Sequence, residues 1–363
     1  MNIAIGICGI GYGHSSRQLV LADAMRSRGH NIVIIAYGTA VDLFRRNKYT
    51  VYEVIPPFLR GNGARLIFTN IIRDNAPRFA RALITNGRAA KAILREHHPD
   101  IFITDYEPIS AWMAYCFRKP LVTVDQQSKF RFFPFSAING FDPREERQRQ
   151  SVFFPWAAKR FVTSFYKIPL GTDSPSISLI PPLIAPDVYA APIRDDRLFL
   201  VYLSRYFGET IGQDYMALQA IFAKFSSHAF HIYAAKREHS QRSPSNVKFF
   251  ELDRVSFIND LARSTGVIST GGHTLISEAL TLGKPLLVLP LATFDQHYCA
   301  HFIESHGLGI TSDHVDCSIL ATFIGATEKF RRNINASDHI MLDRNAVDII
   351  ITYLERRQWQ PVS

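Results

Sequence analysis

Short apolar runs alternate with longer amphipathic segments along the first half of the chain. A run that is apolar on both faces is typical of a buried parallel strand. Such runs lie at Ile3–Cys8, Asn31–Ala36, Val51–Ile55, Ile101–Thr104 and Leu121–Val124. The segment Ser15–Ser27 between the first two has apolar residues at helical spacing. This alternation predicts an open parallel sheet with helices on both faces.

The same pattern begins again in the second half. Pro175–Asp196 has five prolines and no periodicity, which predicts an interdomain linker. Strands are then expected at Leu198–Leu203, Phe230–Ala234, Val247–Phe250, Gly266–Ser269 and Leu286–Pro290. The pattern predicts an α/β protein of two Rossmann-like parallel-sheet domains facing a cleft. Their expected bounds are 1–188 and 189–345, with a C-terminal helix, 346–363, that crosses back to the first domain.

A glycine-rich loop, Gly9-Ile10-Gly11-Tyr12-Gly13, directly follows the first predicted strand. Glycines let the backbone approach a ligand, and the helix that follows presents free N–H groups to an anion. Gly11, Tyr12 and Gly13 are therefore expected to contact an acceptor or a phosphate. The rival interpretation is a dinucleotide site, which requires an acidic residue at the end of the second strand. That strand ends at Ala36 and continues Tyr-Gly-Thr without a carboxylate, so this interpretation is disfavoured.

His14 and Asp105 are the candidate catalytic pair. His14 stands where the loop becomes a helix, and a neutral imidazole there could remove a proton from a hydroxyl group. Asp105 follows the strand Ile101–Thr104, and its carboxylate could orient the imidazole. The alternatives are a histidine that only packs at a helix start, and an aspartate that only caps the next helix, with Glu107 as the competing carboxylate. The sequence alone does not establish contact between His14 and Asp105.

The second half contains a four-part motif: Ser269–Thr274, then Glu278, then Gly283-Lys284-Pro285, then Asp295-Gln296. Two glycines at a helix N-terminus form a cradle for a diphosphate. Glu278 lies one helical turn beyond Thr274 on the same face, where its carboxylate could accept both hydroxyls of a ribose. Asp295 and Gln296 follow the next strand and could bind sugar hydroxyls. A lone Gly-Gly pair would indicate only a helix start, but four parts in this order disfavour that interpretation.

These motifs resemble the donor-binding signature of UDP-sugar-dependent GT-B glycosyltransferases, including the lipid II and glycolipid synthases. The segments Cys8–Arg17 and Thr104–Pro108 resemble a poorly characterised prokaryotic branch of that group. The resemblance implies a metal-independent, inverting transfer, with an acceptor-binding first domain and a donor-binding second domain. It also implies the donor contacts: Glu278 to the ribose, Gly271, Gly272, His273 and Thr274 to the diphosphate, Asp295 and Gln296 to the sugar, and Ser204 among the donor-binding residues.

Two departures from the family pattern concern the donor. Plant-type relatives have a histidine at the position of Thr270 and a tryptophan at the position of His273, so the phosphate contact here differs in detail. No counterpart of their base-stacking tryptophan is evident, and UDP is therefore inferred from the resemblance. We expect a nucleotide-sugar co-substrate and no cofactor. No metal is expected either, because no DxD-type carboxylate pair follows a strand and a helix N-terminus can neutralise the diphosphate.

The net charge of +9 is concentrated in two segments, 58–98 and 128–168. Each contains eight Lys and Arg residues, against five acidic residues in both together. The first predicts a basic amphipathic helix that could lie on an anionic membrane beside a glycolipid acceptor. A less favoured partner is nucleic acid, bound by charge and stacking. Also open are a small hydrophobic acceptor and a solvated basic face whose aromatic residues lie in the core. The second segment includes the aromatic residues Phe130, Phe132, Phe133, Phe153, Phe154 and Trp156.

The remaining composition limits the class of protein. The chain has 363 residues, 47 % hydrophobic and 20 % charged, which suits two globular domains. We see no signal peptide and no apolar run long enough to span a membrane. The four cysteines form no CxxC pair, which indicates reduced thiols in a cytoplasmic enzyme. A lipid acceptor would bring this enzyme to the inner face of the membrane. The alternative functions are a DNA-directed (modified-base) glycosyltransferase, a sugar-nucleotide epimerase and a nucleotide-sugar-binding module without turnover.

Overall fold

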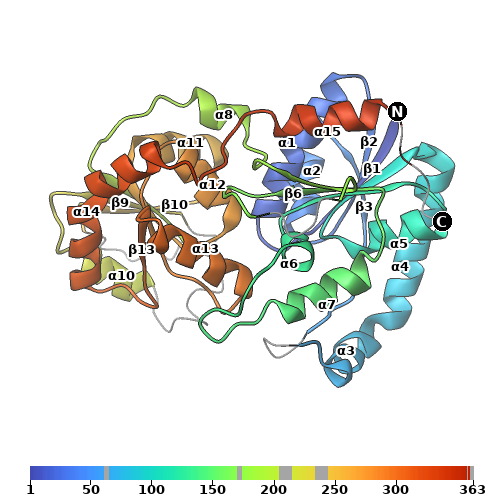
Figure 1. Cartoon of the computed structure of the whole chain (residues 1–363), viewed down its shortest axis with the longest axis horizontal. Coiled ribbons are helices and arrows are strands. Elements are labelled where there is room, and N and C mark those ends of the chain that lie inside the picture. Colours follow the sequence, from blue (N-terminus) through green and yellow to red (C-terminus); the bar gives the residue numbers. More distant parts are fainter. Residues whose placement is uncertain (61–64, 170–173, 204–214, 234–243, 358, 360–363) are drawn as a thin grey trace. The chain divides into compact units, whose positions relative to one another are not determined.

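The computed structural model describes residues 1–60, 65–169, 174–203, 215–233, 244–357 and 359 (Figure 1). The chain divides into two compact units. The first comprises Met1–Leu183 together with Met341–Ser363, and the second comprises Ile184–Ile340. The division after Leu183 lies five residues before the expected position 188, and the C-terminal segment belongs to the first unit.

The first unit is built on a parallel sheet. Within its described residues the sheet has seven strands in the order β3-β2-β1-β4-β5-β6-β7. Apolar residues on both faces of the central strands are buried, as expected for a sheet covered on both sides. The strands are β1 (Asn2–Ile7), β2 (Asn31–Ala36), β3 (Thr50–Glu53), β4 (Ile101–Asp105), β5 (Leu121–Asp125), β6 (Lys159–Thr163) and β7 (Ile177–Ile180).

Strand β7 corrects the predicted linker. It lies inside Pro175–Asp196 and pairs in parallel with β6, with Arg160 opposite Ile177. Proline density predicted an unstructured connection, but the prolines flank the strand and do not interrupt it. The short helix α8 (Pro186–Ala190) lies in the same segment and begins the second unit.

Helices cover both faces of the first sheet. One apolar core joins the sheet to α1, α2 and α15, and another joins it to α4, α5 and α7. The C-terminal helix packs beside α1, where Arg28 pairs with Asp348 at 2.6 Å (Figure 1). The helices are α1 (Gly13–Ser27), α2 (Thr39–Arg46), α3 (Phe68–Asn75), η1 (Ala76–Arg78), α4 (Phe79–Ala92), η2 (Ile93–His97), α5 (Pro108–Cys116), α6 (Lys129–Phe132), α7 (Arg144–Phe153) and α15 (Ala346–Glu355).

The second unit repeats this architecture. Within its described residues six parallel strands have the order β10-β9-β8-β11-β12-β13. The strands are β8 (Leu198–Tyr202), β9 (Ala229–Tyr233), β10 (Val247–Phe250), β11 (Ser264–Ser269), β12 (Leu286–Val288) and β13 (Gly309–Thr311). The other helices are α10 (Tyr215–Phe222), α11 (Arg254–Arg263), α12 (His273–Thr281), α13 (Phe294–Ser305) and α14 (Cys317–Ala336). The predicted fold class, two Rossmann-like parallel-sheet domains, is confirmed.

The strand order reverses direction once in each sheet, beside its first strand. The reversal lies between β1 and β4 in the first unit and between β8 and β11 in the second. Open α/β sheets bind ligands at the carboxyl ends of the strands at such a point. The predicted motifs after β1, β4 and β11 all lie there, because each follows directly on its strand.

Candidate functional site

His14 and Asp105 contact each other in the first unit. Strands β1 and β4 are neighbours with Ile7 opposite Asp105, so the loop after β1 returns to the end of β4. His14 Nδ1 lies 2.8 Å from Asp105 Oδ1. The imidazole keeps 13 % of its side-chain surface exposed, whereas the carboxylate is fully buried. This geometry joins a partly accessible base to a buried carboxylate, as in a catalytic dyad.

A buried cation holds Asp105 in its ionised form. The Arg17 guanidinium donates from Nε to Oδ2 at 2.6 Å and from a terminal nitrogen to Oδ1. Gln18 adds a third bond to Oδ2 at 3.1 Å. Burial of Asp105 opposes ionisation, but the charges of Arg17 and His14 outweigh burial and lower the pKa of Asp105 to about 2. The carboxylate therefore stays negative over the whole neutral range.

Arg17 also reaches the imidazole itself. Its terminal nitrogen lies 2.7 Å from His14 Nδ1, the same atom that contacts Asp105. A guanidinium only donates and a carboxylate only accepts, so Nδ1 either donates to Asp105 or accepts from Arg17. Sequence reasoning assigned no role to Arg17 or Gln18. The available signal was spacing, since Arg17 lies one helical turn beyond His14 on α1.

Glu107, the competing carboxylate, caps helix α5. It is fully buried and accepts hydrogen bonds from the backbone N–H groups of Ile109 (2.9 Å) and Ser110 (2.6 Å). Pro108 occupies the first helical position, where its missing N–H costs nothing. The capping role considered for Asp105 thus belongs to Glu107, which leaves Asp105 to Arg17, Gln18 and His14.

We expect Glu107 to make stability depend on pH. Desolvation by burial raises the pKa of Glu107 from 4.5 to about 7, although Ser110 and Ile109 oppose the shift. The folded state therefore retains a proton that the unfolded state releases, and stability is lost as the pH rises from about 4.5 through about 7. In Glu107→Gln this loss should disappear, so that wild type loses about 2.5 kcal/mol relative to the variant between about pH 5 and pH 8. Denaturant unfolding of both proteins at each pH measures the difference, and parallel stability curves would contradict the prediction.

The glycine-rich loop is held by the first residue of α2. The Thr39 hydroxyl donates to the carbonyls of Gly9 (3.1 Å) and Gly11 (2.6 Å). A Cβ at Gly9 would overlap the Tyr37 carbonyl, so only glycine fits that position. Tyr12 and Gly11 remain exposed at the turn, beside the start of α1. The loop is thus held rigidly with its tip open to a ligand.

The second unit forms the predicted turn between β11 and α12. Gly271 has φ +83°, which favours glycine, and a Cβ there would come within 3.1 Å of Val288. Gly272 is the N-cap residue and has no side chain to occupy the N–H groups of the first turn. His273 and Thr274 follow as the first helical residues, and the His273 side chain is buried. A helix N-terminus of this kind attracts an anion.

Glu278 lies on α12 and is paired with a cation. Its Oε1 accepts from Arg254 at 2.8 Å, and Arg254 also forms two 2.9 Å bonds with Asp187 on α8. Burial raises the pKa of Glu278, and the Arg254 charge opposes that shift. Within the described residues no donor reaches Oε2 of Glu278, so that oxygen has capacity for a ligand hydroxyl. Sequence reasoning missed Arg254 and Asp187, which are far from the motif along the chain.

The remaining motif residues have distinct environments. Asp295 and Gln296 lie in the first turn of α13 and are partly exposed. Gln296 Oε1 accepts from the backbone N–H of Leu291 at 2.8 Å, which fixes the side-chain amide. Lys284 is buried and donates to the backbone carbonyls of Arg194 and Ser264, so its contacts are structural. Burial lowers the pKa of Lys284 to about 8. Ser204 lies outside the described residues.

The two basic segments differ in exposure. In 128–168, Phe130, Phe133, Phe153 and Phe154 are buried, and Trp156 is exposed. The interpretation of this segment as a stacking surface for nucleic acid bases is therefore wrong for those four phenylalanines, which belong to the core of the first unit. The composition could not reveal this, because interleaved charges do not say which way the rings point. In 58–98, by contrast, several large apolar side chains are exposed.

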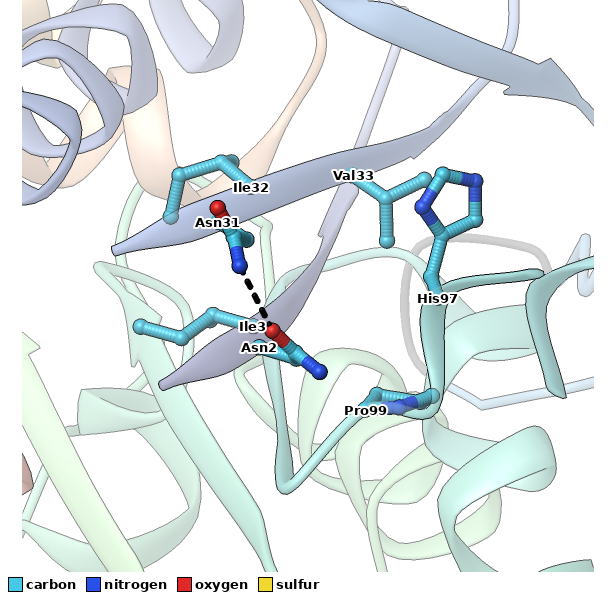
Figure 2. Close-up of a pocket in the computed structure, with 7 residues that line it drawn as sticks. All are labelled: Asn2, Ile3, Asn31, Ile32, Val33, His97 and Pro99. Atoms are coloured by element: carbon cyan, nitrogen blue, oxygen red, sulfur yellow. Dashed lines mark hydrogen bonds between the residues drawn. The ribbon is translucent and has the colours of Figure 1, made fainter. Parts of the chain in front are cut away.

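A cavity of about 30 Å³ lies at the amino ends of β1 and β2, next to the hydrogen bond between Asn31 and Asn2 (Figure 2). It suits a water molecule and not a sugar nucleotide, and it lies at the sheet edge opposite to the motifs. No cluster of three or more His, Cys, Asp or Glu residues that could hold a metal occurs in the described chain. None of the described helices is long and apolar enough to cross a membrane.

Comparison with known proteins identifies the family and the fold. A family model described as glycosyl transferase family 1 matches residues 1–327. An uncharacterized glycosyltransferase of Methanosarcina acetivorans is 24 % identical over 331 residues, which is 85 % of each chain. Another from Methanosarcina mazei is 23 % identical over 334 residues, again 85 % of each chain.

Solved structures share the fold at low sequence identity. CalG4, the calicheamicin glycosyltransferase, superposes with a TM-score of 0.63 and 16 % identity over 99 % of both chains. The spinosyn rhamnosyltransferase SpnG complexed with thymidine diphosphate gives a TM-score of 0.62 at 17 % identity, over 98 % of this chain and 100 % of that one. The chain belongs to glycosyl transferase family 1 and is a glycosyltransferase with the GT-B fold.

Proposed function

We propose that this glycosyltransferase moves a sugar from a UDP-sugar donor to an acceptor hydroxyl. The transfer needs no metal and inverts the configuration at the anomeric carbon. The observation that carries the proposal is the contact between His14 and Asp105 at the ends of neighbouring strands. In this proposal the first unit binds the acceptor and the second unit binds the donor.

The proton transfer assigns a role to each nitrogen of His14. With its proton on Nδ1, donated to Asp105, the neutral imidazole has a free Nε2 that accepts the acceptor's hydroxyl proton. The acceptor oxygen bonds to the anomeric carbon as the bond to the diphosphate oxygen breaks, and UDP leaves. A single displacement inverts the configuration. The ionised Asp105 stabilises the imidazolium that forms.

Arg17 sets a condition on this mechanism. If Nδ1 accepts from Arg17, the proton of the neutral imidazole is on Nε2, and His14 is not a base toward the acceptor. Catalysis therefore requires the tautomer in which Nδ1 faces Asp105. Arg17 remains bonded to both carboxylate oxygens in that tautomer, which makes it a positioning residue for Asp105.

The proposed donor contacts all come from residues of the second unit. The turn Gly271–Thr274 would hold the diphosphate at the N-terminus of α12, where the helix dipole neutralises part of the leaving charge. Glu278 would accept ribose hydroxyls through Oε2 while Arg254 holds Oε1. Asp295 and Gln296 would bind the sugar. The fixed carbonyl of Gln296 leaves its amide N–H groups for a sugar oxygen.

The donor nucleotide and the acceptor are the finer parts of the proposal. UDP is chosen from the resemblance of the motif, whereas the related SpnG structure contains thymidine diphosphate. For the acceptor we propose a glycolipid at an anionic membrane, because the exposed basic and apolar residues of 58–98 suit a lipid surface. Nucleic acid is the weaker alternative, since the four phenylalanines of 128–168 are buried.

Incubation with UDP-sugars and dTDP-sugars in the presence of EDTA tests the donor and the chemistry together. We expect slow hydrolysis of a UDP-sugar without acceptor, because water replaces the missing hydroxyl group, and a rate that EDTA does not change. Released UDP and the configuration of the free sugar at early times are measured by chromatography and NMR.

Other outcomes reject defined parts of the proposal. A rate abolished by EDTA and restored by Mg²⁺ or Mn²⁺ contradicts metal independence. Hydrolysis restricted to dTDP-sugars would show that the donor nucleotide is dTDP and not UDP. Release of the sugar with retained configuration would contradict the inverting mechanism. A sugar that is epimerised while still attached to UDP would replace transfer by epimerisation.

A further inference from the structure

Helices α3 and α4 of the first unit expose large apolar side chains. Within the described residues α3 buries none of its side chains, and α4 buries only Ala89. Five large apolar residues are exposed, with exposed fractions from 53 % to 73 %. These are Phe68, Ile72, Phe79, Leu83 and Ile84. A monomeric protein rarely leaves so many such residues together in water.

Four of these side chains form two pairs, one on each helix. Phe68 and Ile72 are four residues apart on α3, and Phe79 and Leu83 are four apart on α4, so each pair lies on one side of its helix. Figure 1 shows α3 at the far end of α4 from the sheet of the first unit. We call these five residues the α3–α4 face.

Basic residues are interspersed with the α3–α4 face along the same helices. Arg73, Arg81, Arg88 and Lys91 are exposed, and the Arg78 guanidinium stacks on the half-exposed ring of Phe58 at 4.0 Å. The single acidic residue of Phe68–Ala92 is Asp74, which already pairs with Arg60 at 2.8 Å. Residues 68–92 therefore have a net charge of +4.

We propose that the α3–α4 face docks on the surface of an anionic lipid bilayer. Apolar side chains enter the acyl boundary while Arg and Lys contact the headgroups, which is how an amphipathic helix binds in the membrane interface. A second copy of the chain fits less well, since two faces of charge +4 would repel each other. Nucleic acid would engage the arginines but leave the aliphatic Ile72, Leu83 and Ile84 in water.

The biological role of this docking rests on the proposed function, because docking would bring the first unit to a lipid-linked acceptor. Its physical basis is separate, since exposure and charge do not involve His14 or the donor motif. Binding to vesicles is therefore measured apart from turnover.

Co-sedimentation of the full-length protein with vesicles tests the proposal. Wild type is expected to bind vesicles of mixed phosphatidylglycerol and phosphatidylcholine at least about tenfold more tightly than vesicles of phosphatidylcholine alone, and less tightly as salt is added. Two double variants, Phe79→Ser with Leu83→Ser and Arg81→Glu with Arg88→Glu, should each weaken binding by about tenfold or more.

Matched variants elsewhere control for exposure and charge. Val255 on α11 is 78 % exposed, and Val255→Ser should bind as wild type does. Lys329→Glu with Arg332→Glu makes the same change of charge on exposed residues of α14, and should reduce binding much less. Melting temperatures and hydrolysis of the donor sugar by all variants should match wild type.

Three outcomes would overturn the docking surface. These are equal binding to neutral and anionic vesicles, unchanged binding by both double variants, and a wild-type dimer that Phe79→Ser with Leu83→Ser dissociates. Vesicle binding without any sugar transfer would instead reject the proposed function and leave the surface intact.

Discussion

Replacing His14 with alanine is expected to lower turnover by about 10²–10⁴-fold, because the acceptor hydroxyl loses its general base. UDP affinity should remain nearly intact, since the proposed donor contacts all belong to the second unit. Turnover, melting temperature and calorimetric UDP affinity are measured on the same preparation. Slower turnover at unchanged UDP affinity would separate a base from a packing residue.

Two further variants sharpen this test. His14→Asn keeps a polar side chain toward Asp105 but has no basic nitrogen, so its rate should match that of His14→Ala. His306→Ala removes a partly buried histidine that packs on Phe302 in the second unit, and should change stability alone. A His14→Ala protein that melts early but transfers at the wild-type rate per folded molecule would end the assignment.

Because Asp105 is paired with the buried Arg17, an Asp105 variant affects stability as well as catalysis. Asp105→Asn should lower turnover less than His14→Ala, but it also leaves the buried Arg17 guanidinium without the carboxylate that it bonds. Breaking such a pair costs about 3–5 kcal/mol of stability. Combining Asp105→Asn with Arg17→Gln removes both charges and should recover stability without recovering turnover. A double-mutant cycle therefore distinguishes folding from chemistry at this site.

The motifs and strands were predictable because they depend on neighbours in the sequence. A run such as Ile101–Thr104 is apolar on both faces, and two glycines before a helix permit few conformations. The contact between His14 and Asp105 was not predictable in the same way. It requires β4 to lie beside β1, although β2 and β3 come between them in the chain.

The partners of the motif residues were missed for a related reason. Arg254 reaches Glu278 from another helix, and Asp187 joins them from the segment taken as linker. Neither has a local sequence signal, because a side-chain pair depends on how helices pack. Arg17 is the exception, since its one-turn spacing from His14 was visible, but the direction of its guanidinium toward Asp105 was not.

Replacing Glu278 with alanine is expected to weaken UDP binding by about 2–3 kcal/mol, because a charged acceptor of the ribose hydroxyls is lost. The pairing with Arg254 raises the alternative that Glu278 only ties α12 to α11. If the pair is only structural, Glu278→Ala should have a lower melting temperature, and the folded variant should bind UDP as tightly as wild type. Calorimetry with UDP below the melting transition decides between the two.

Asp260 supplies the matched control for this measurement. It is another buried carboxylate of the second unit, bonded to His231 at 2.6 Å and Tyr233 at 2.8 Å, and it lies outside the motif. Asp260→Asn should therefore lower stability without changing UDP affinity. Arg254→Ala should weaken UDP binding less than Glu278→Ala, because the carboxylate would lose its support but keep its oxygens. If Glu278→Ala and Asp260→Asn both bind UDP as tightly as wild type, the ribose contact assigned to Glu278 is wrong and the donor site must be sought at other residues.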